Sequence, residues 1–340
     1  APHIDTVINP EIEVVKTIVR LMKVPGAVDV GEFAGGRVKL VGIKIDEKSP
    51  MAGLLLSDFE SRFGRDRPLI AAVIRQGDLI IPRGSNRIKV GDVVYFISES
   101  EKLEKTIEVF NKKVRPLKRV MIVGGGRIGD RLARKLEKEN LHIKVVESDL
   151  KRCNELSEKM GKAIVLHGDG SDQKIMMEES IGDCDVVVAL TSHEETNILV
   201  SLLARNLGAH STITKISKFG YFPLMSTIGL QKVVSPRLSA INSILQEIRK
   251  GKVLSAVSVF GEDAEVIEAV ALETSRITNK PLKKLSFPKG AILVCIITDD
   301  EIVIPTGDSV VAPNDRVIIF AKRQAVKKLE NMLTVKLRFF

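Results

Sequence analysis

An internal repeat constrains the fold of this chain more than any other feature of its sequence. Residues 70–97 and 293–320 align without gaps at an offset of 223, and the identical positions include Pro82 with Pro305 and Asp92 with Asp315. A second block aligns at an offset of 226 and leads into an amphipathic helix in each copy. A repeat of this kind is one structural unit used twice, so we expect two copies of one small fold.

The helix in each copy carries its apolar residues at spacings of three and four. The first stripe is formed by Ile12, Val15, Ile18, Val19 and Met22, and the second by Leu238, Ile241, Ile244, Leu245 and Ile248. This spacing places each stripe on one helix face. Such a face can pack into the core of its own domain or pair two units, and the sequence leaves both alternatives open.

After each helix come short alternating strand runs, punctuated by Gly-Asp and Pro-x-Gly turns, which predict a small α/β module. A complete α/β domain precedes only the second copy, so if the repeat covers whole domains we expect about 110 further residues before residue 1 of the natural polypeptide. The predicted organisation is a domain remnant with its last strand and crossover helix (1–27), the first module and linker (28–115), a Rossmann-like domain (116–234), a crossover and dimerisation helix (235–252) and the second module (253–340).

The formal charge of +9 invites a nucleic-acid hypothesis, but its distribution argues against one. Residues 1–115, 116–250 and 251–340 carry +3, +4 and +2, whereas a nucleic-acid footprint concentrates charge in a patch or stripe. Aromatic residues make up only 4% of the chain. The three cysteines form no CxxC pair, and no apolar run approaches the roughly 20 residues of a membrane span. We therefore expect a reducing cytosol and no nucleic-acid partner.

A glycine-rich loop follows the first strand of the central domain. Residues 120–123 form a short apolar run, and Gly124, Gly126 and Gly129 complete a G-x-G-x-x-G pattern before a helix. The first glycine permits a tight turn, the second lets backbone approach a pyrophosphate, and the third lets helix pack on strand. The pyrophosphate is then expected at the positive end of the helix dipole.

An acidic residue supports this interpretation. A second strand, 143–146, ends at Glu147, which lies 18 residues after Gly129. A carboxylate there accepts hydrogen bonds from ribose hydroxyls and disfavours a 2′-phosphate, which favours NAD over NADP. The alternative is a plain glycine turn followed by a surface glutamate.

Three more strands place polar residues at the same sheet edge. Asp169 would lie near an adenine, or would form an Asx turn or helix cap. Thr191 and Ser192 could meet phosphate or ribose, while Thr191 could equally be the N-cap of the following helix. Lys215 is a candidate phosphate or ribose contact, or a solvated lysine. The three strands are expected at 163–166, 186–190 and 212–216.

The five histidines are scattered, and none is spaced for metal binding with another ligand. His193 lies near the sheet edge and resembles a dehydrogenase acid/base, but no partner carboxylate or substrate arginine accompanies it. We predict no catalytic residue and no metal site.

The order of these motifs resembles the TrkA family, the peripheral regulatory subunits of Trk-type potassium uptake, which are built from tandem RCK (KTN) units. The resemblance rests on G-G-G-R-I-G, Glu147, G-D-G-S-D at 168–172, A-L-T-S at 189–192, Ser235-Pro236 with its helix, and the doubled module. The resemblance covers essentially the whole chain. This chain departs from the family pattern by lacking nearly all of the first nucleotide-binding half. The resemblance implies a Rossmann-like RCK N-type sheet with two RCK C-type modules.

The resemblance also implies function. It implies a cytosolic dimer or tetramer on the inner face of the cell membrane, docked to an integral potassium-transporting subunit of the TrkH/TrkG kind. The implied cofactor is NAD or NADH, with ATP and ADP as competing ligands. The cofactor-binding residues are then Gly124, Gly125, Gly126, Arg127, Ile128, Gly129, Glu147, Asp169, Thr191, Ser192 and Lys215.

The sequence thus favours a regulator over a catalyst. Nucleotide occupancy would shift the arrangement of paired units, and those units would act on the membrane subunit. The alternative is an NAD-dependent oxidoreductase, which shares the glycine loop but needs an acid/base group and an anion-binding arginine. Binding of nucleotide without hydride transfer would separate the two.

Overall fold

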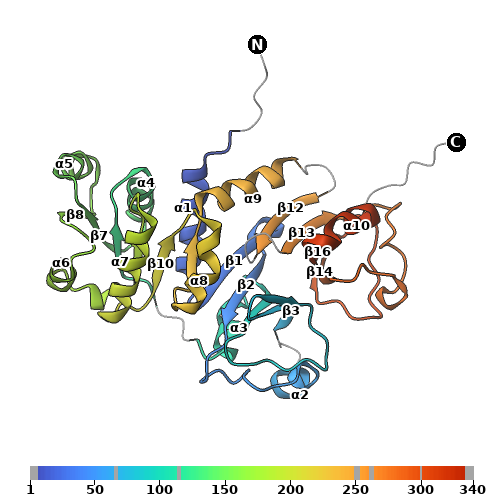
Figure 1. The fold of residues 1–340 in the computed structure, drawn as a ribbon. Coiled ribbons are helices and arrows are strands. Elements are labelled where there is room, and N and C mark those ends of the chain that lie inside the picture. The colour runs from blue at the N-terminus through green and yellow to red at the C-terminus, as the bar shows by residue number, and fades with distance from the viewer. Residues whose placement is uncertain are drawn as a thin grey trace, which may run out of the picture. The chain divides into compact units, whose positions relative to one another are not determined.

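The computed structural model describes residues 7–64, 68–112, 116–248, 253–259, 264–298 and 301–333. The chain forms two compact units that do not follow sequence order. The α/β unit combines Ala1–Pro25 with Arg115–Ile241, and the module unit combines Gly26–Val114 with Asn242–Phe340. Figure 1 shows the elements of both units along the chain.

The α/β unit is built on a six-stranded sheet in which every neighbouring pair is parallel. Its order, β11-β10-β9-β6-β7-β8, is that of a doubly wound fold. The chain winds outward in one direction through β7 and β8 and in the other through β9, β10 and β11, so the order reverses between β6 and β9. The strands are β6 (Arg119–Val123), β7 (His142–Glu147), β8 (Ile164–His167), β9 (Val186–Ala189), β10 (Thr212–Lys215) and β11 (Lys232–Val234).

Helices connect these strands, as parallel pairing requires. Strand β9 is buried at every position, so it reads as a continuous apolar run rather than an alternating one. The predicted strands at 120–123, 143–146, 163–166, 186–190 and 212–216 are confirmed to within one or two residues. The helices are α4 (Arg127–Leu136), α5 (Leu150–Lys159), α6 (Gln173–Glu178), α7 (Glu194–Asn206), α8 (Phe222–Thr227) and α9 (Pro236–Ile248).

Helix α1 (Pro10–Lys23) belongs to the α/β unit and lies against α4 and β11 (Figure 1). Asn9 caps it, with its side-chain oxygen accepting from the amide of Glu11 at 2.9 Å. Of the strand expected before this helix, residues 1–6 lie outside the described residues, and residues 7–9 form none.

The apolar face of α1 differs from the predicted stripe. Three members of that stripe, Val15, Ile18 and Met22, are buried as predicted. Val14 and Leu21 are buried beside them, whereas Ile12 is 40% exposed. The buried face is therefore rotated from the one that Ile12 defines, because the side chains that meet the sheet edge and α4 decide which part of a broad apolar stripe is covered. In α9, Ile244 is 42% exposed, and the side chains of Leu245 and Ile248 lie outside the described residues.

The module unit contains two antiparallel sheets with the same strand order, β1-β2-β5-β3-β4 and β12-β13-β16-β14-β15. The predicted repeat is thus confirmed strand for strand. The first copy has β1 (Ala27–Phe33), β2 (Val38–Lys44), α2 (Phe59–Phe63), β3 (Leu69–Arg75), β4 (Asp78–Ile80), β5 (Val93–Glu99) and α3 (Leu103–Val109). The second has β12 (Val253–Val259), β13 (Ala264–Val270), β14 (Ala291–Ile297), β15 (Ile302–Val303), β16 (Arg316–Lys322) and α10 (Arg323–Leu333).

The two copies bury one continuous core between them. The rings of Tyr95 and Phe320, one from each copy, lie 6.2 Å apart between centroids. The backbone N–H of Ala34 donates to the buried carboxylate of Glu268 at 3.1 Å. At the position of Glu268 the first copy has Gly42, where an added Cβ would lie 3.0 Å from the Tyr95 ring. These two equivalent positions therefore carry different residues, each suited to its own neighbours.

Candidate functional site

The glycine loop between β6 and α4 has the geometry that a phosphate-binding turn requires. Gly124 has a φ of +107° and donates its N–H to the carbonyl of Val146 at 2.8 Å. A Cβ on Gly129 would lie 2.0 Å from the Gly124 carbonyl oxygen, so this position needs glycine for the helix to pack on the loop. By contrast, a Cβ on Gly126 would meet nothing within 4 Å. The space over Gly126 is open to a ligand.

The carboxylate of Glu147 points back at this loop. Its Oε2 accepts the Gly125 N–H at 2.7 Å, and its Oε1 accepts the Asp149 N–H at 3.0 Å and the Ser148 hydroxyl at 3.3 Å. A Cβ on Gly125 would lie 2.4 Å from Leu156, so the loop passes close to α5. Glu147 thus fixes the loop from the end of β7 and stands where a ribose would offer its hydroxyls.

Sequence reasoning missed Arg152, which holds the loop from the other side. Its Nε donates to the Gly125 carbonyl at 2.9 Å, and its other nitrogens pair with Asp130 at 3.1 Å and Glu155 at 2.9 Å. The hydrogen bond to Glu155, together with that to Asp130, raises the pKa of Arg152. Its position in the first turn of α5, directly after β7, places it at the carboxyl edge of the sheet. The sequence does not indicate which basic residue of that helix reaches the loop.

Arg127 and Ile128 open helix α4. The Arg127 side chain is 84% exposed, and its Nε lies 2.7 Å from Oε1 of Glu11 on α1. Ile128 is half-buried. Arg127 is therefore the cation of the loop that can reach outward from the helix terminus.

Asp169 forms the local turn that was one of its two predicted roles. Its Oδ1 accepts the backbone N–H of Ser171 at 2.8 Å and the Ser171 hydroxyl at 2.7 Å. The bond from the Ser171 backbone is the main cause that lowers the pKa of Asp169. Asp172, not Asp169, caps α6 by accepting from Lys174. Asp169 is exposed at the carboxyl end of β8, so a contact with adenine stays a prediction.

Thr191 is not the N-cap of α7. That position is taken by His193, because the helix begins only at Glu194, and the His193 side chain makes no capping bond. The Thr191 hydroxyl donates to Asn197 Oδ1 at 2.8 Å instead. Ser192 is exposed and lies 3.0 Å from the His193 ring.

Asn197, which sequence reasoning left without a role, ties two strand ends together. It is fully buried, and its Nδ2 donates to the carbonyls of Thr191 at 3.2 Å and Lys215 at 3.1 Å. The ends of β9 and β10 are thereby held side by side. An asparagine one turn into a helix after a strand carries no motif of its own, so only the structure shows this role.

Lys215 ends β10 half-buried, and its ammonium has no hydrogen-bond or ion-pair partner among the described residues. Desolvation lowers its pKa, and the charge of Glu194 opposes that shift. A partly desolvated cation that forms no ion pair with a described residue favours an anionic ligand. Its neighbour Lys218 is different, since it pairs with Glu195 at 3.0 Å.

The parallel sheet brings the predicted residues to one edge. Each of them lies at, or just after, the carboxyl end of a strand: the glycine loop, Glu147, Asp169, Thr191 with Ser192, and Lys215. The loop after β6 and the Thr191 turn after β9 flank the point where the strand order reverses. Open α/β sheets bind ligands at such a point.

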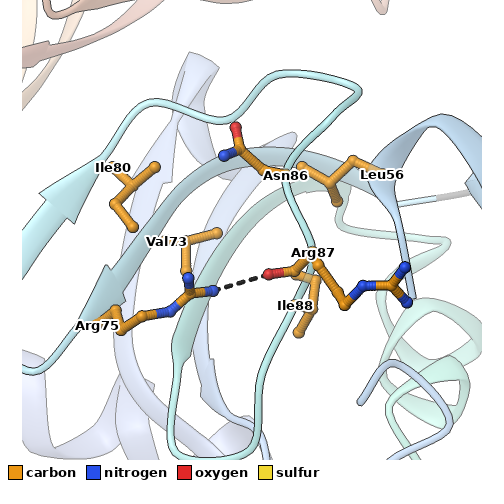
Figure 2. A pocket seen from close by; sticks show the side chains of 7 residues that line it. All are labelled: Leu56, Val73, Arg75, Ile80, Asn86, Arg87 and Ile88. Carbon is orange, nitrogen blue, oxygen red and sulfur yellow. Dashed lines mark hydrogen bonds between the residues drawn. The ribbon is translucent and has the colours of Figure 1, made fainter. Parts of the chain in front are cut away.

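A small cavity lies in the first module, but it has too little volume for a nucleotide. Figure 2 shows Arg75 reaching across it to the Arg87 carbonyl at 2.7 Å. The cavity measures about 10 Å³, which is at most one water. Arg75 also pairs bidentately with the buried Asp92, one of the repeated residues, so its role is to hold a turn.

The described residues lack the groups that two other kinds of site require. No three His, Cys, Asp or Glu side chains there gather as a metal site would need. Every helix there also falls short of the length and hydrophobicity that a membrane crossing requires.

Sheet order, glycine loop and the acidic residue that ends β7 together define a Rossmann-like domain, here joined to two small β-rich modules. The TrkA-N domain family matches residues 120–236, and the TrkA-C domain family matches residues 40–111 and 266–334. The chain belongs to the TrkA family, as these matches cover both of its units.

Named relatives agree with that assignment. The Trk system potassium uptake protein TrkA of Azorhizobium caulinodans is 35% identical over 339 residues, which are 99% of this chain and 74% of the relative. TrkA homolog 1 of Methanosarcina mazei is 36% identical over 328 residues, or 96% and 72% of the two chains.

Solved structures agree on the fold. The GsuK RCK domain aligns with a TM-score of 0.51 and 16% identity over 95% of this chain and 70% of that one. The GsuK channel bound to NAD aligns with a TM-score of 0.50 and 16% identity, over 95% of this chain and 57% of that one.

Proposed function

We propose that this chain is a nucleotide-binding regulatory subunit of a potassium uptake system, and that NAD(H) or ATP and ADP bound at the β6–β9 edge control a membrane ion-conducting subunit. The observation that carries the proposal is the open space over Gly126, in a loop whose preceding residue, Gly125, is held by the Glu147 carboxylate. Lys215 ends β10 at the same sheet edge, and its ammonium has no ion-pair partner among the described residues. The relatives that share the whole chain are named for potassium uptake.

Each part of the edge has a distinct task in this proposal. The amides of the loop and the α4 terminus hold the pyrophosphate, with Arg127 adding charge. Glu147 accepts from the ribose hydroxyls, at the expense of its present bond to Gly125. Thr191, Ser192 and Lys215 contact the second phosphate or ribose, and Asn197 keeps their strands in register.

Binding regulates only if the nucleotide prefers one arrangement of the protein over another. We propose that the chain assembles as a dimer or tetramer on the inner face of the cell membrane, docked to an integral potassium-transporting subunit. Exposed apolar side chains such as Ile244 of α9 support a pairing role for that helix.

The rival proposal is an NAD-dependent oxidoreductase. Its strongest candidate residue, His193, is exposed and bonds to the neighbouring Ser192 hydroxyl rather than to a carboxylate. A hydride-transfer site also needs a group that orients the substrate. We propose no catalytic role for this chain.

Calorimetric titration of the purified chain with NAD, NADH, ATP and ADP tests the proposal directly. We expect at least one of them to bind with a Kd in the micromolar range, about −8 kcal/mol, and a panel of 2-hydroxy acids and alcohols to give no NADH production. The same ligand should change potassium flux when the membrane subunit is reconstituted with this chain. Hydride transfer at enzymatic rates, or no binding of any of the four, would reject the proposal.

A further inference from the structure

The contact between Glu11 and the nucleotide loop links two parts of the α/β unit that are far apart in sequence. The Glu11 side chain is only 19% exposed and lies between two arginines of α4, at 2.7 Å from Arg127 Nε and 3.5 Å from Arg131 Nε. Arg127 is the residue that directly follows Gly126 in the loop. The Glu11 carboxylate of α1 is therefore paired with Arg127, the exposed cation of the proposed phosphate site.

Helix α1 is held along α4 at both ends. Near its end, Lys23 lies 3.7 Å from Glu139, just beyond the last turn of α4. Between the two ends an open groove of about 680 Å³ is lined by Ile12 and Lys16 of α1 and by basic residues of α4. Water therefore reaches this seam, and the ion pairs contribute to holding the first turn of α1 in place.

The last turn of α1, at the opposite end from Glu11, leads directly into the first module. Only Val24, Pro25 and Gly26 separate the end of α1 from β1, the first strand of that module. Helix α1 is therefore the element of the α/β unit that leads into the first module.

We infer that Glu11 is an intramolecular competitor for Arg127, so that a nucleotide phosphate binding at the loop displaces it and loosens the first turn of α1. The inference rests on the proposed function, since it concerns the regulation of the same site. In this inference the exposed Arg127 side chain turns from Glu11 toward the phosphate, and its Nε bond to Glu11 is lost. By linkage, the contact that weakens nucleotide binding is itself weakened by the nucleotide to the same degree.

The size of the effect follows from the exposure of the pair. Exposed ion pairs contribute about 0.2–1 kcal/mol, and a state occupied by a competitor lowers apparent affinity in proportion to its population. Removing the carboxylate by Glu11→Gln should therefore raise nucleotide affinity about 2- to 6-fold. The gain should shrink at high salt.

Calorimetry on four variants of the full chain tests this. Glu11→Gln should bind NADH or ATP more tightly than wild type, and Arg127→Gln more weakly. Adding Glu11→Gln to Arg127→Gln should change nothing further. The matched control is Glu13→Gln, which removes the same charge from the same helix but pairs with Lys16 at 2.8 Å. Its affinity should stay within about 1.5-fold of wild type, since the Glu13 carboxylate is paired with Lys16 and not with Arg127.

Hydrogen exchange of residues 10–18 gives an independent readout. Saturating nucleotide should speed their exchange about 2- to 6-fold in wild type and leave it unchanged in Glu11→Gln. If wild type binds nucleotide but Glu11→Gln binds no better, or if Glu13→Gln has an equal effect, the competition is overturned and the proposed function stands. If wild type binds none of the four nucleotides, both fall.

Discussion

The carboxyl edge of the parallel sheet and the shared core of the two modules treat their side chains in opposite ways. At the edge, Gly126 faces open space and Lys215 has a half-buried ammonium with no described partner. In the module core, Phe320 is fully buried and packs against Tyr95. The sheet edge leaves polar groups accessible, while the module core buries its apolar side chains against one another.

Buried charges show the same contrast. Glu268 in the module unit accepts the Ala34 N–H at 3.1 Å and lies 3.6 Å from Arg316. Lys232 on β11 is also buried, but among the described residues its ammonium donates to the Leu21 carbonyl of α1 at 3.4 Å and forms no ion pair. Burial without an anion lowers the pKa of Lys232 to about 8. The module core therefore compensates its buried charge better than the α1–β11 contact does.

The largest expected effect breaks the module core. Phe320→Ala removes a fully buried ring and should lower the free energy of unfolding by about 3–5 kcal/mol. Denaturant unfolding measures it, with Leu224→Ala, at a side chain that is 49% exposed, as the control. Nucleotide affinity should stay unchanged, because the sheet edge belongs to the other unit. A parallel loss of binding would contradict this separation.

A smaller effect is expected at Lys232. Its pKa is about 8 in the folded chain and about 10.5 when unfolded, so between these values the unfolded chain binds more protons. Stability should therefore rise with pH from about 8 to about 10.5, and the cost of the buried ammonium is fully present below pH 8.

Lys232→Met should accordingly raise the free energy of unfolding at pH 7 by about 1–3 kcal/mol. Chemical unfolding at pH 7, 9 and 10.5 checks this, and the difference between variant and wild type should close as the pH rises. A constant difference, or a destabilised variant at pH 7, would show that the bond to Leu21 outweighs desolvation.

The smallest effect sharpens the description of the sheet edge. Gly126 has an ordinary extended conformation and room for a Cβ, so Gly126→Ala should leave stability unchanged or raise it by up to about 1 kcal/mol. The added methyl group occupies the space proposed for the pyrophosphate, and nucleotide affinity should fall at least about tenfold, or about 1.4 kcal/mol. Titration calorimetry and thermal unfolding together separate the two results.

Gly129→Ala is the matched comparison for that variant. Its Cβ would meet the Gly124 carbonyl oxygen at 2.0 Å, so both stability and binding should drop. Equal behaviour of the two alanine variants would mean that the space over Gly126 is not where a nucleotide phosphate sits.

Sequence patterns predicted the strands, the glycine loop and the repeat because each depends on local periodicity or on a fixed turn. They did not predict Arg152 or Asn197, which act through atoms brought close only by the fold. Of the two roles left open for Thr191, the helix cap is excluded, since the N-cap of α7 lies two residues later, at His193, and the Thr191 hydroxyl bonds to Asn197. Strand ends and helix starts depend on such competing hydrogen bonds, which a single sequence does not rank.

By itself, the sequence determined the doubled module, the order of strands and helices, and the residues that follow each parallel strand. Tertiary structure alone decided that α1 joins the α/β unit, that the two modules share one core, and that Glu11 reaches Arg127. The physical reason is that periodicity specifies which face of an element is apolar, whereas its partner is chosen by long-range burial. Contacts between residues more than a hundred positions apart leave no local pattern to read.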